Sequence, residues 1–171
     1  KLSVSKEAKK RGNGYLNVAL FGVDSRDNDL DKGTRSDTIM IASLNKKTMK
    51  VKIASIYRDT LSEQEDGTLN KINAAYSYGG PEGALSVLNK NLDMNIEHYV
   101  TVNFNSMIDI VDSVGGIDID VQEDEMPYIC GYVQEIMKVT GKLSPGVTEP
   151  GTQTLNGVQA TAYARIRYTA G

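Results

Sequence analysis

The sequence predicts an α/β domain built around a mixed β-sheet. Apolar runs of strand length alternate with stretches of helical periodicity, which is the pattern of a layered α/β fold. Two of the apolar runs are separated only by the turn segment "NKKT", which predicts a hairpin and therefore an antiparallel pair. Other strands are connected through helices, as parallel neighbours usually are. Both kinds of connection in one sheet make it mixed.

Length and composition exclude several protein classes. A chain of 171 residues is long enough for one domain with a real core. With 19 basic and 22 acidic residues the net charge is −3, which argues against a general nucleic-acid-binding protein. The single cysteine, Cys130, allows no internal disulfide and is expected to be structural, and one histidine, His98, is too few for a histidine-based zinc site. No apolar run approaches the ~20 residues of a membrane span.

Residues 1–15 are predicted to be a basic tail that precedes a domain of residues 16–171. The tail holds five cations against the single acid Glu7 and ends in "GNG". Such a run is typical of a solvated tail, and it would also suit the stub of a membrane tether.

Three strands are predicted in the first third of the chain. Residues 16–23 form a near-continuous apolar run that ends at Asp24, and residues 37–45 and 50–57 form two more. The hairpin makes the second and third strands antiparallel neighbours. The first strand is expected to be central and covered on both faces.

Helices are predicted next. After an acidic polar loop at residues 62–67, "NKINAAYSYGG" has helical spacing and is stopped by its two glycines. A second helix begins at Pro81, with one apolar face that carries Leu85, Leu88 and Leu92.

The second half continues the alternation. Residues 97–104 are predicted to be a strand and residues 105–114 a helix, followed by an alternating strand at 117–121. Residues 122–151 are predicted to be a long excursion, a lid or a binding wall, because they contain three prolines and Gly141. A last helix is expected from Asn156, its N-cap, through Tyr163. The residues of the 105–114 helix expected to point inward are Met107, Ile110, Val111 and Val114.

Arginine and aspartate occur side by side at the predicted strand ends. The sequence has "DSR" at Asp24–Arg26, "RSD" at Arg35–Asp37 and "RD" at Arg58–Asp59, and "ARIRY" supplies Arg165 and Arg167. Arginine binds phosphate oxygens two at a time, and aspartate offers hard oxygens to Mg²⁺. These pairs are typical of a site for a polyanion that carries a metal. The alternative is a set of solvated surface ion pairs.

The predicted connectivity brings the first three pairs together. Ligands of open α/β sheets bind beyond strand ends. Because the second and third strands are antiparallel, the segment before one and the segment after the other fall at the same edge. The first pair joins them if the first strand runs in the required direction.

Two motifs that resemble known sites do not fit. "DNDLDKG" is similar to the start of an EF-hand loop, but its glycine is one place late and Thr38 stands where a bidentate Glu is needed. "GNG" precedes a strand instead of following one, and no GxxxxGK loop is present.

An ordered set of motifs closely resembles the LytR–CpsA–Psr family of bacterial cell-envelope phosphotransferases. The motifs are "NVALFGVDSR", "TRSDTIMIASLN", "KIASIYRDT", "NKINAAYSYGGPEGAL", "YVTVNFNSMIDIVDSVGGIDIDV" and "TLNGVQATAYARIRY". The resemblance implies an α/β/α sandwich with an apolar lipid groove, held outside the cell by an N-terminal membrane helix. It implies transfer of a glycopolymer, such as teichoic acid or capsular polysaccharide, from undecaprenyl pyrophosphate to a peptidoglycan hydroxyl.

The resemblance also implies roles for individual residues. Asp24 and Asp37 match the acidic pair at the Mg²⁺ ion, and either could accept the proton of the attacking hydroxyl. The pyrophosphate-contacting positions correspond to Arg26, Arg35, Arg58, Lys71, Arg165 and Arg167. The catalytic set implied is Asp37, Arg58, Asp59, Arg165 and Arg167.

Some features depart from the family, and some readings remain open. Tyr57 replaces a frequent proline, an acidic loop replaces a proline-glycine loop, and the family continues beyond "RYTAG" into a segment that completes the site. The helix at residues 84–92 and the side chains of Val111, Val114 and Ile117 could line a lipid groove or belong to ordinary core. A polyprenyl-pyrophosphate hydrolase and a non-catalytic module that binds polyprenyl phosphate are the alternative functions.

Overall fold

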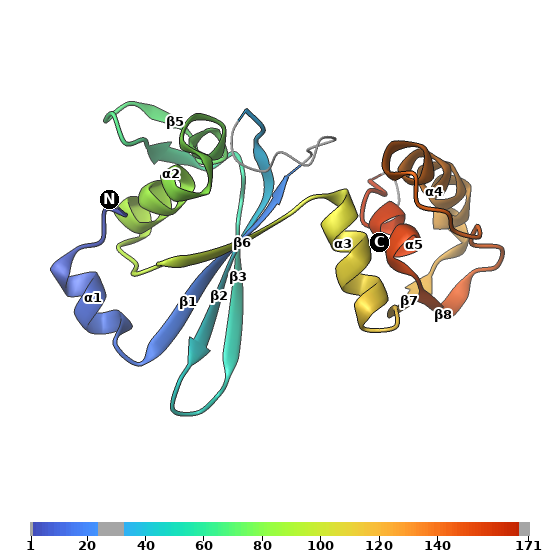
Figure 1. Ribbon diagram of the computed structural model, residues 1–171, viewed down its shortest axis with the longest axis horizontal. Helices are drawn as coiled ribbons and strands as arrows, with labels where there is room; N and C mark the ends of the chain where they lie inside the picture. The colour runs from blue at the N-terminus through green and yellow to red at the C-terminus, as the bar shows by residue number, and fades with distance from the viewer. Residues whose placement is uncertain (1, 24–32, 168–171) are drawn as a thin grey trace. The chain divides into compact units, whose positions relative to one another are not determined.

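The computed structural model describes residues 2–23 and 33–167. The contacts divide the chain into two compact units, unit 1 at Lys1–Asn103 and unit 2 at Phe104–Gly171. Figure 1 shows the helices and strands of both. None of the described helices is both long enough and apolar enough to cross a membrane.

Unit 1 contains a four-stranded mixed sheet in the order β3-β2-β1-β6. Its strands are β1 (Tyr15–Val23), β2 (Ser36–Asn45), β3 (Val51–Ile56) and β6 (His98–Val102). The pairs β1–β2 and β2–β3 are antiparallel, whereas β1–β6 is parallel. The predicted α/β class, mixed sheet, hairpin and central first strand are therefore confirmed.

Helix α2 (Ala74–Leu92) packs on one face of this sheet. The rings of Phe21 on β1 and Tyr76 on α2 meet edge to face with centroids 5.2 Å apart, and the Tyr76 hydroxyl is 3.0 Å from Thr101 Oγ1 on β6. Leu85 and Leu88 belong to the same core, so their ordinary-core reading is confirmed. The first strand was predicted to be covered on both faces, and the residues of β1 on the opposite face are half-buried, so that face is only partly covered. Ile53 of the neighbouring β3, on the same face, is 63% exposed.

The predicted break between two helices is a kink inside α2. Gly80 has φ 64° and ψ −160°, which interrupts the helix directly before Pro81. Glycine readily adopts a positive φ. Proline is tolerated at the start of the second helical segment because the backbone N–H that it lacks would have no intrahelical acceptor there. The glycine and proline signals were therefore interpreted correctly.

The N-terminal segment contains a helix, which corrects the prediction of a solvated tail. Helix α1 (Lys6–Gly12) is capped by Ser5, whose Oγ accepts a hydrogen bond from Ala8 N at 2.9 Å. Ala8 is buried, and Arg11 forms an ion pair with Asp93. The high charge of this segment favoured the prediction of a tail, although it also contains a helix N-cap and one apolar residue. These are enough to form a short helix when the rest of unit 1 provides tertiary contacts to it.

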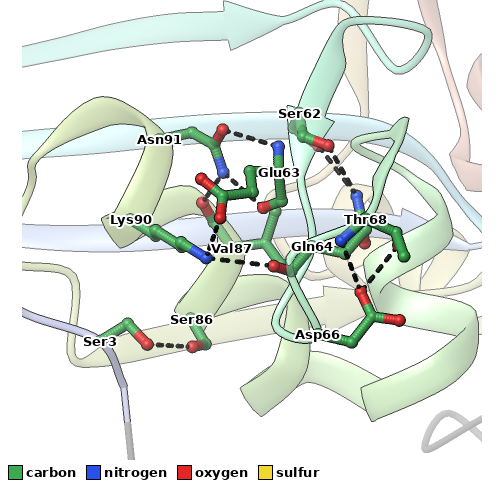
Figure 2. A network of polar contacts seen from close by, with 10 residues as sticks. All are labelled: Ser3, Ser62, Glu63, Gln64, Asp66, Thr68, Ser86, Val87, Lys90 and Asn91. Carbon is green, nitrogen blue, oxygen red and sulfur yellow. Dashed lines mark hydrogen bonds and ion pairs between the residues drawn. The ribbon is translucent and has the colours of Figure 1, made fainter.

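A small hairpin replaces the predicted polar loop. Strands β4 (Leu61–Glu63) and β5 (Leu69–Lys71) pair antiparallel, and the polar contacts that tie them to α2 are shown in Figure 2. Lys90 Nζ is 2.8 Å from Glu63 Oε1, and Asn91 exchanges two 2.9 Å hydrogen bonds with the Glu63 backbone. These long-range contacts order a segment whose own composition predicted a loop.

Unit 2 packs three helices around a separate two-stranded sheet. Its elements are α3 (Phe104–Ser113), β7 (Ile117–Val121), the 3₁₀ turn η1 (Glu123–Glu125), α4 (Met126–Thr140), β8 (Gly151–Leu155) and α5 (Gly157–Tyr163). The predicted strand at residues 117–121 exists, but it pairs antiparallel with β8 and lies outside the four-stranded sheet. The predicted Asn156 N-cap is confirmed, because its side chain accepts from Gln159 N at 3.0 Å.

The prediction of an irregular excursion at residues 122–151 is wrong for its first half. Pro127 lies in the first turn of α4, and Gly141 is the left-handed C-cap with φ 72°. Both residues delimit this helix, because proline is tolerated at a helix start and glycine is favoured at a helix end. Cys130 lies on α4 and donates to Val147 O at 3.3 Å, but the residue is exposed, so it is not part of the core as a structural cysteine would be.

The buried face of α3 differs from the predicted one. Ile108 and Val111 are buried, whereas Met107, Ile110 and Val114 are 38%, 48% and 70% exposed. The buried face is set by α5, because Gly157 lies against the Ile108 backbone. Val111 belongs to the core of unit 2, so its ordinary-core reading is also confirmed.

Candidate functional site

Four charged residues meet at one edge of unit 1. Asp37 lies at the start of β2, Arg58 and Asp59 follow the end of β3, and Lys71 is the last residue of β5. Because β2 and β3 are antiparallel, the start of one and the end of the other coincide. The convergence predicted for Asp37, Arg58 and Asp59 is confirmed.

These residues form a continuous chain of ion pairs, which we call the charged cluster. Arg58 Nη1 donates to Asp37 Oδ1 at 2.7 Å, and Arg58 Nε lies 3.8 Å from Asp59 Oδ2. Lys71 Nζ lies 2.6 Å from the other oxygen of Asp59. The side chains are between 42% and 57% exposed, so the cluster is open to solvent.

Backbone hydrogen bonds hold the segments of the cluster in place. Thr60 N donates to Tyr57 O at 2.9 Å, which closes a turn around Arg58 and Asp59. Ile72 N donates to Thr60 O at 2.8 Å, and Asn73 N donates to Arg58 O at 3.2 Å. The "RDT" turn and the start of "KINAAY" are thereby fixed side by side. The backbone positions of the arginine and the lysine are therefore fixed by the fold itself.

Asp59 is held as a carboxylate by its cationic neighbours. The hydrogen bond from Lys71 is the main reason that the pKa of Asp59 is lowered from its usual 3.8, and the charges of Lys71, Arg58 and Arg35 act in the same direction against desolvation. The effect of Arg35, which precedes β2 and is exposed, places a third cation in the field of the cluster. Three cations and two carboxylates leave a positive balance that favours a polyanion.

We expect a Lys71→Met variant to raise the pKa of Asp59 toward its usual value of 3.8. Methionine keeps the length of the side chain but removes the hydrogen bond and the charge. In the native protein the lowered pKa means that the stabilisation from Asp59 is complete above 3.8 and is lost as the pH falls through the folded-state value. A carboxyl NMR titration measures the change. Arg11→Met, which breaks a different ion pair of unit 1, should leave the titration of Asp59 unaltered; an equal shift in both variants would contradict the assignment.

The described residues fit only part of the predicted metal site. Asp24 and Arg26 lie outside the described residues. Asp37 has one carboxylate oxygen engaged by Arg58, and within the described ranges no group of three or more His, Cys, Asp or Glu residues is arranged to hold a metal. Mg²⁺ requires only one or two carboxylates when water and substrate phosphate complete its shell. The second oxygen of Asp37 is compatible with that mode of binding.

The two predicted C-terminal arginines belong to unit 2 and have different environments. Arg165 Nη2 lies 3.1 Å from Glu135 Oε1, and its guanidinium carbon lies 5.5 Å and 5.1 Å from the ring centroids of Phe104 and Tyr132. Arg165 Nη1 is buried and has no hydrogen-bond partner among residues 2–23 and 33–167. Arg167 is exposed. Arg165 is therefore held by an ion pair and two aromatic rings, whereas Arg167 faces solvent.

Several polar residues beside the predicted ones were not identified from the sequence. Glu135 and Tyr132 fix Arg165, and their helical spacing on α4 was hidden by the prediction of an irregular segment. Ser36 Oγ and Asn73 Oδ1, adjacent in sequence to the charged cluster, are buried without hydrogen-bond partners in the described part of the chain. Their position within the motifs "RSD" and "KIN" is the feature of the sequence that could have identified them as residues beside the site.

Comparison with known proteins yields one consistent family. The LytR_cpsA_psr family profile matches residues 1–171. A teichoic acid transferase of Bacillus subtilis, "Polyisoprenyl-teichoic acid--peptidoglycan teichoic acid transferase TagV", is 35% identical over 155 residues, covering 89% of this chain and 37% of the relative. The TagU transferase of Bacillus cereus is 38% identical over 158 residues, covering 90% and 44%. The chain thus spans less than half the length of these relatives.

Solved structures agree with this result. "TagT bound to LI-WTA" superposes with a TM-score of 0.70 at 28% identity, covering 92% of this chain and 57% of that one. A TagT structure with bound octaprenyl pyrophosphate lipid gives 0.68 at 28%, with 91% and 58% covered. The crystal structure of B. subtilis TagV gives 0.66 at 31%, with 90% and 56% covered. The profile match over the whole chain, together with these relatives, shows that the protein belongs to the LytR–CpsA–Psr family.

Proposed function

We propose that the chain is the catalytic part of a Mg²⁺-dependent phosphotransferase. It would move a glycopolymer from a polyprenyl-pyrophosphate carrier to a hydroxyl of peptidoglycan. The carrier we propose is undecaprenyl pyrophosphate. Such a reaction takes place in the cell envelope, at the outer face of the cytoplasmic membrane. The observation that carries the proposal is the charged cluster at the edge of the unit 1 sheet. The names of the relatives, which are teichoic acid transferases acting on peptidoglycan, support the choice of substrate.

The ion pairs of the cluster can be exchanged for contacts to a pyrophosphate. A guanidinium has five donors in a planar fork, and Arg58 uses one of them in a hydrogen bond to Asp37. Its remaining donors can bind two phosphate oxygens at once. Arg35 and Lys71 would add charge from either side. Because all these side chains are partly exposed and solvent screens their charges, giving up the existing pairs costs little.

The reaction itself follows from the chemistry of phosphoryl transfer. The oxygen of the acceptor hydroxyl forms a bond to the phosphorus that carries the glycan, and the bond from that phosphorus to the bridging oxygen of the pyrophosphate breaks. Polyprenyl phosphate leaves with the electron pair, and the hydroxyl proton passes to a carboxylate, for which Asp24 and Asp37 are the candidates. Arg58 and Lys71 stabilise the negative charge that grows during this step. Asp59, whose pKa is lowered, is a weak base and acts as a positioning residue for Arg58 and Lys71.

A metal would assist at the same place. Asp37 and Asp24 are the residues that would hold Mg²⁺, which when bound neutralises phosphate charge. The family resemblance assigns Arg165 and Arg167 to pyrophosphate binding, and this role remains a prediction.

A transfer assay with three arms tests the proposal. Lipid-linked glycan is incubated with the chain in three reactions: with peptidoglycan acceptor and Mg²⁺, without acceptor, and without Mg²⁺. Released polyprenyl phosphate and glycan joined to peptidoglycan are measured in each. The proposal predicts that both products form together and only with acceptor and Mg²⁺. Release without acceptor would identify a hydrolase instead. Tight, Mg²⁺-independent binding without turnover would identify a binding module and contradict the proposal.

A further inference from the structure

A second cationic region lies at the opposite end of the unit 1 sheet. It is formed by α1 and the turn between β2 and β3, and we call it the basic end. In Figure 1 this helix and this turn lie at the same end of the sheet, and Lys46 N donates to Gly14 O at 2.9 Å, which joins the turn to the α1–β1 connection. The ten residues of β2 separate the basic end from Asp37, a distance of roughly 30 Å. The residues that define it are Lys9, Lys10, Lys46, Lys47 and Lys50.

The lysines of the basic end form no ion pair with other residues in the described part of the chain. All five are exposed, and within the described ranges none forms an ion pair. Arg11 of the same helix differs from these lysines, because it forms an ion pair with Asp93. In a chain with a net charge of −3, this concentration of unpaired cations is a local asymmetry that favours an anionic partner.

An apolar side chain lies in the turn that carries three of these lysines. Met49 is 68% exposed at the tip of the turn, with a φ of 56° that few side chains other than glycine and asparagine adopt readily. The turn is well fixed: Asn45 Oδ1 accepts from both Lys47 N and Thr48 N at 2.9 Å. Tyr15, at the start of β1, is 46% exposed. An apolar tip and a tyrosine surrounded by lysines are typical of a surface that enters the headgroup layer of a membrane.

A polar pocket of about 420 Å³ lies within the basic end. Lys9, Lys10 and Lys46 line it together with Asn17 and Glu97. Asn17 is 8% exposed; its Nδ2 donates to Asn95 O at 3.1 Å, which fixes the amide orientation, and its Oδ1 is buried without a partner in the described part of the chain. An unpaired acceptor beside three cations fits a ligand that combines phosphate with hydroxyl donors, as a glycerol headgroup does.

We propose that the basic end docks on a bilayer of anionic phospholipid, with Met49 in the headgroup layer and a phosphate-bearing headgroup in the lysine-lined pocket. A soluble polyanion would also be attracted by the lysines, but it offers no apolar region with which the exposed methionine could make contact. The docking surface lies away from the charged cluster and does not depend on the proposed transfer activity.

Vesicle flotation of the whole 171-residue chain tests this inference. The chain should float with vesicles of equal parts phosphatidylglycerol and phosphatidylcholine and not with phosphatidylcholine alone. Each lysine near an anionic surface contributes about fivefold in affinity, so Lys46→Glu should weaken binding on the order of tenfold or more. Lys138→Glu, which makes the same charge change at an exposed residue of α4, is the matched control and should bind as the wild type does.

Met49→Asn separates a membrane from a soluble polyanion. Asparagine tolerates the positive φ, so folding is preserved while the apolar tip is lost, and vesicle binding should fall severalfold. The inference is overturned if the wild type floats equally with both vesicle types, or if Lys46→Glu and Lys138→Glu bind alike. It is also overturned if Met49→Asn binds as the wild type does while soluble poly(glycerol phosphate) releases the protein from the vesicles.

Discussion

An Arg58→Ala variant is expected to lose transfer activity by about a hundredfold to a thousandfold, the range found when one donor that stabilises developing charge is removed. Arg58 stands at the centre of the charged cluster, between Asp37 at 2.7 Å and Asp59 at 3.8 Å. Its replacement removes the planar fork and leaves two carboxylates to repel the pyrophosphate. The transfer assay with lipid-linked glycan measures this loss.

The loss can be distinguished from unfolding. Arg58 and Asp37 are 42% and 45% exposed, and a pair so exposed contributes no more than about 1 kcal/mol to stability. Arg11→Ala removes an arginine of unit 1 that is also ion-paired, to Asp93, and should retain full transfer activity. Arg58→Lys keeps the charge but not the fork and should recover only part of the rate. Equal activity of Arg58→Ala and the wild type would remove the charged cluster from the mechanism.

A Gly157→Ala variant is expected to destabilise unit 2 by about 3 kcal/mol, at the upper end of the usual cost of overpacking. A Cβ at this position would lie 2.3 Å from the Ile108 carbonyl oxygen and 2.7 Å from its Cα. Both are backbone atoms, so α3 and α5 must move apart to admit a methyl group. The hydrogen bond from Gly157 N to Asp112 Oδ1, now 2.7 Å, would be stretched as well. Urea unfolding followed by circular dichroism gives the change in free energy.

The matched control is Gly131→Ala in α4. No atom lies within 4 Å of a Cβ built there, and alanine is favoured over glycine in a helix interior. This variant should stabilise unit 2 by about 0.5–1 kcal/mol, a change of opposite sign. If Gly157→Ala is as stable as Gly131→Ala, the close approach of α5 to α3 is wrong.

Local signals in the sequence predicted the parts of the fold that local physics determines. The strands β1, β2 and β3 are apolar runs bounded by polar turn residues, and Asn156 followed by Gln159 is a cap that needs no distant partner. From the hairpin alone it followed that Asp37 and Arg58 share an edge of the sheet. This inference identified the centre of the candidate site before any side-chain geometry was known.

The elements that were not predicted depend on distant partners or on residues with two meanings. The β4–β5 hairpin is held by Lys90 and Asn91 on α2, contacts that no local pattern reveals. Proline interrupts helices but also begins them, so Pro127 concealed α4. These missed elements also affected the prediction of the site. Because β5 was not predicted, the Lys71–Asp59 pair could not be inferred from connectivity, and because α4 was not predicted, neither could the pairing of Arg165 with Glu135.

A crystal structure of the protein soaked with polyprenyl pyrophosphate and Mg²⁺ tests the central claim most directly. The claim is that the charged cluster binds a lipid-borne pyrophosphate. The predicted result is a pyrophosphate whose oxygens accept hydrogen bonds from Arg58, with Lys71 and Arg35 beside it. A pyrophosphate bound elsewhere on the molecule, with Arg58 still paired to Asp37 and Asp59 alone, would contradict the account.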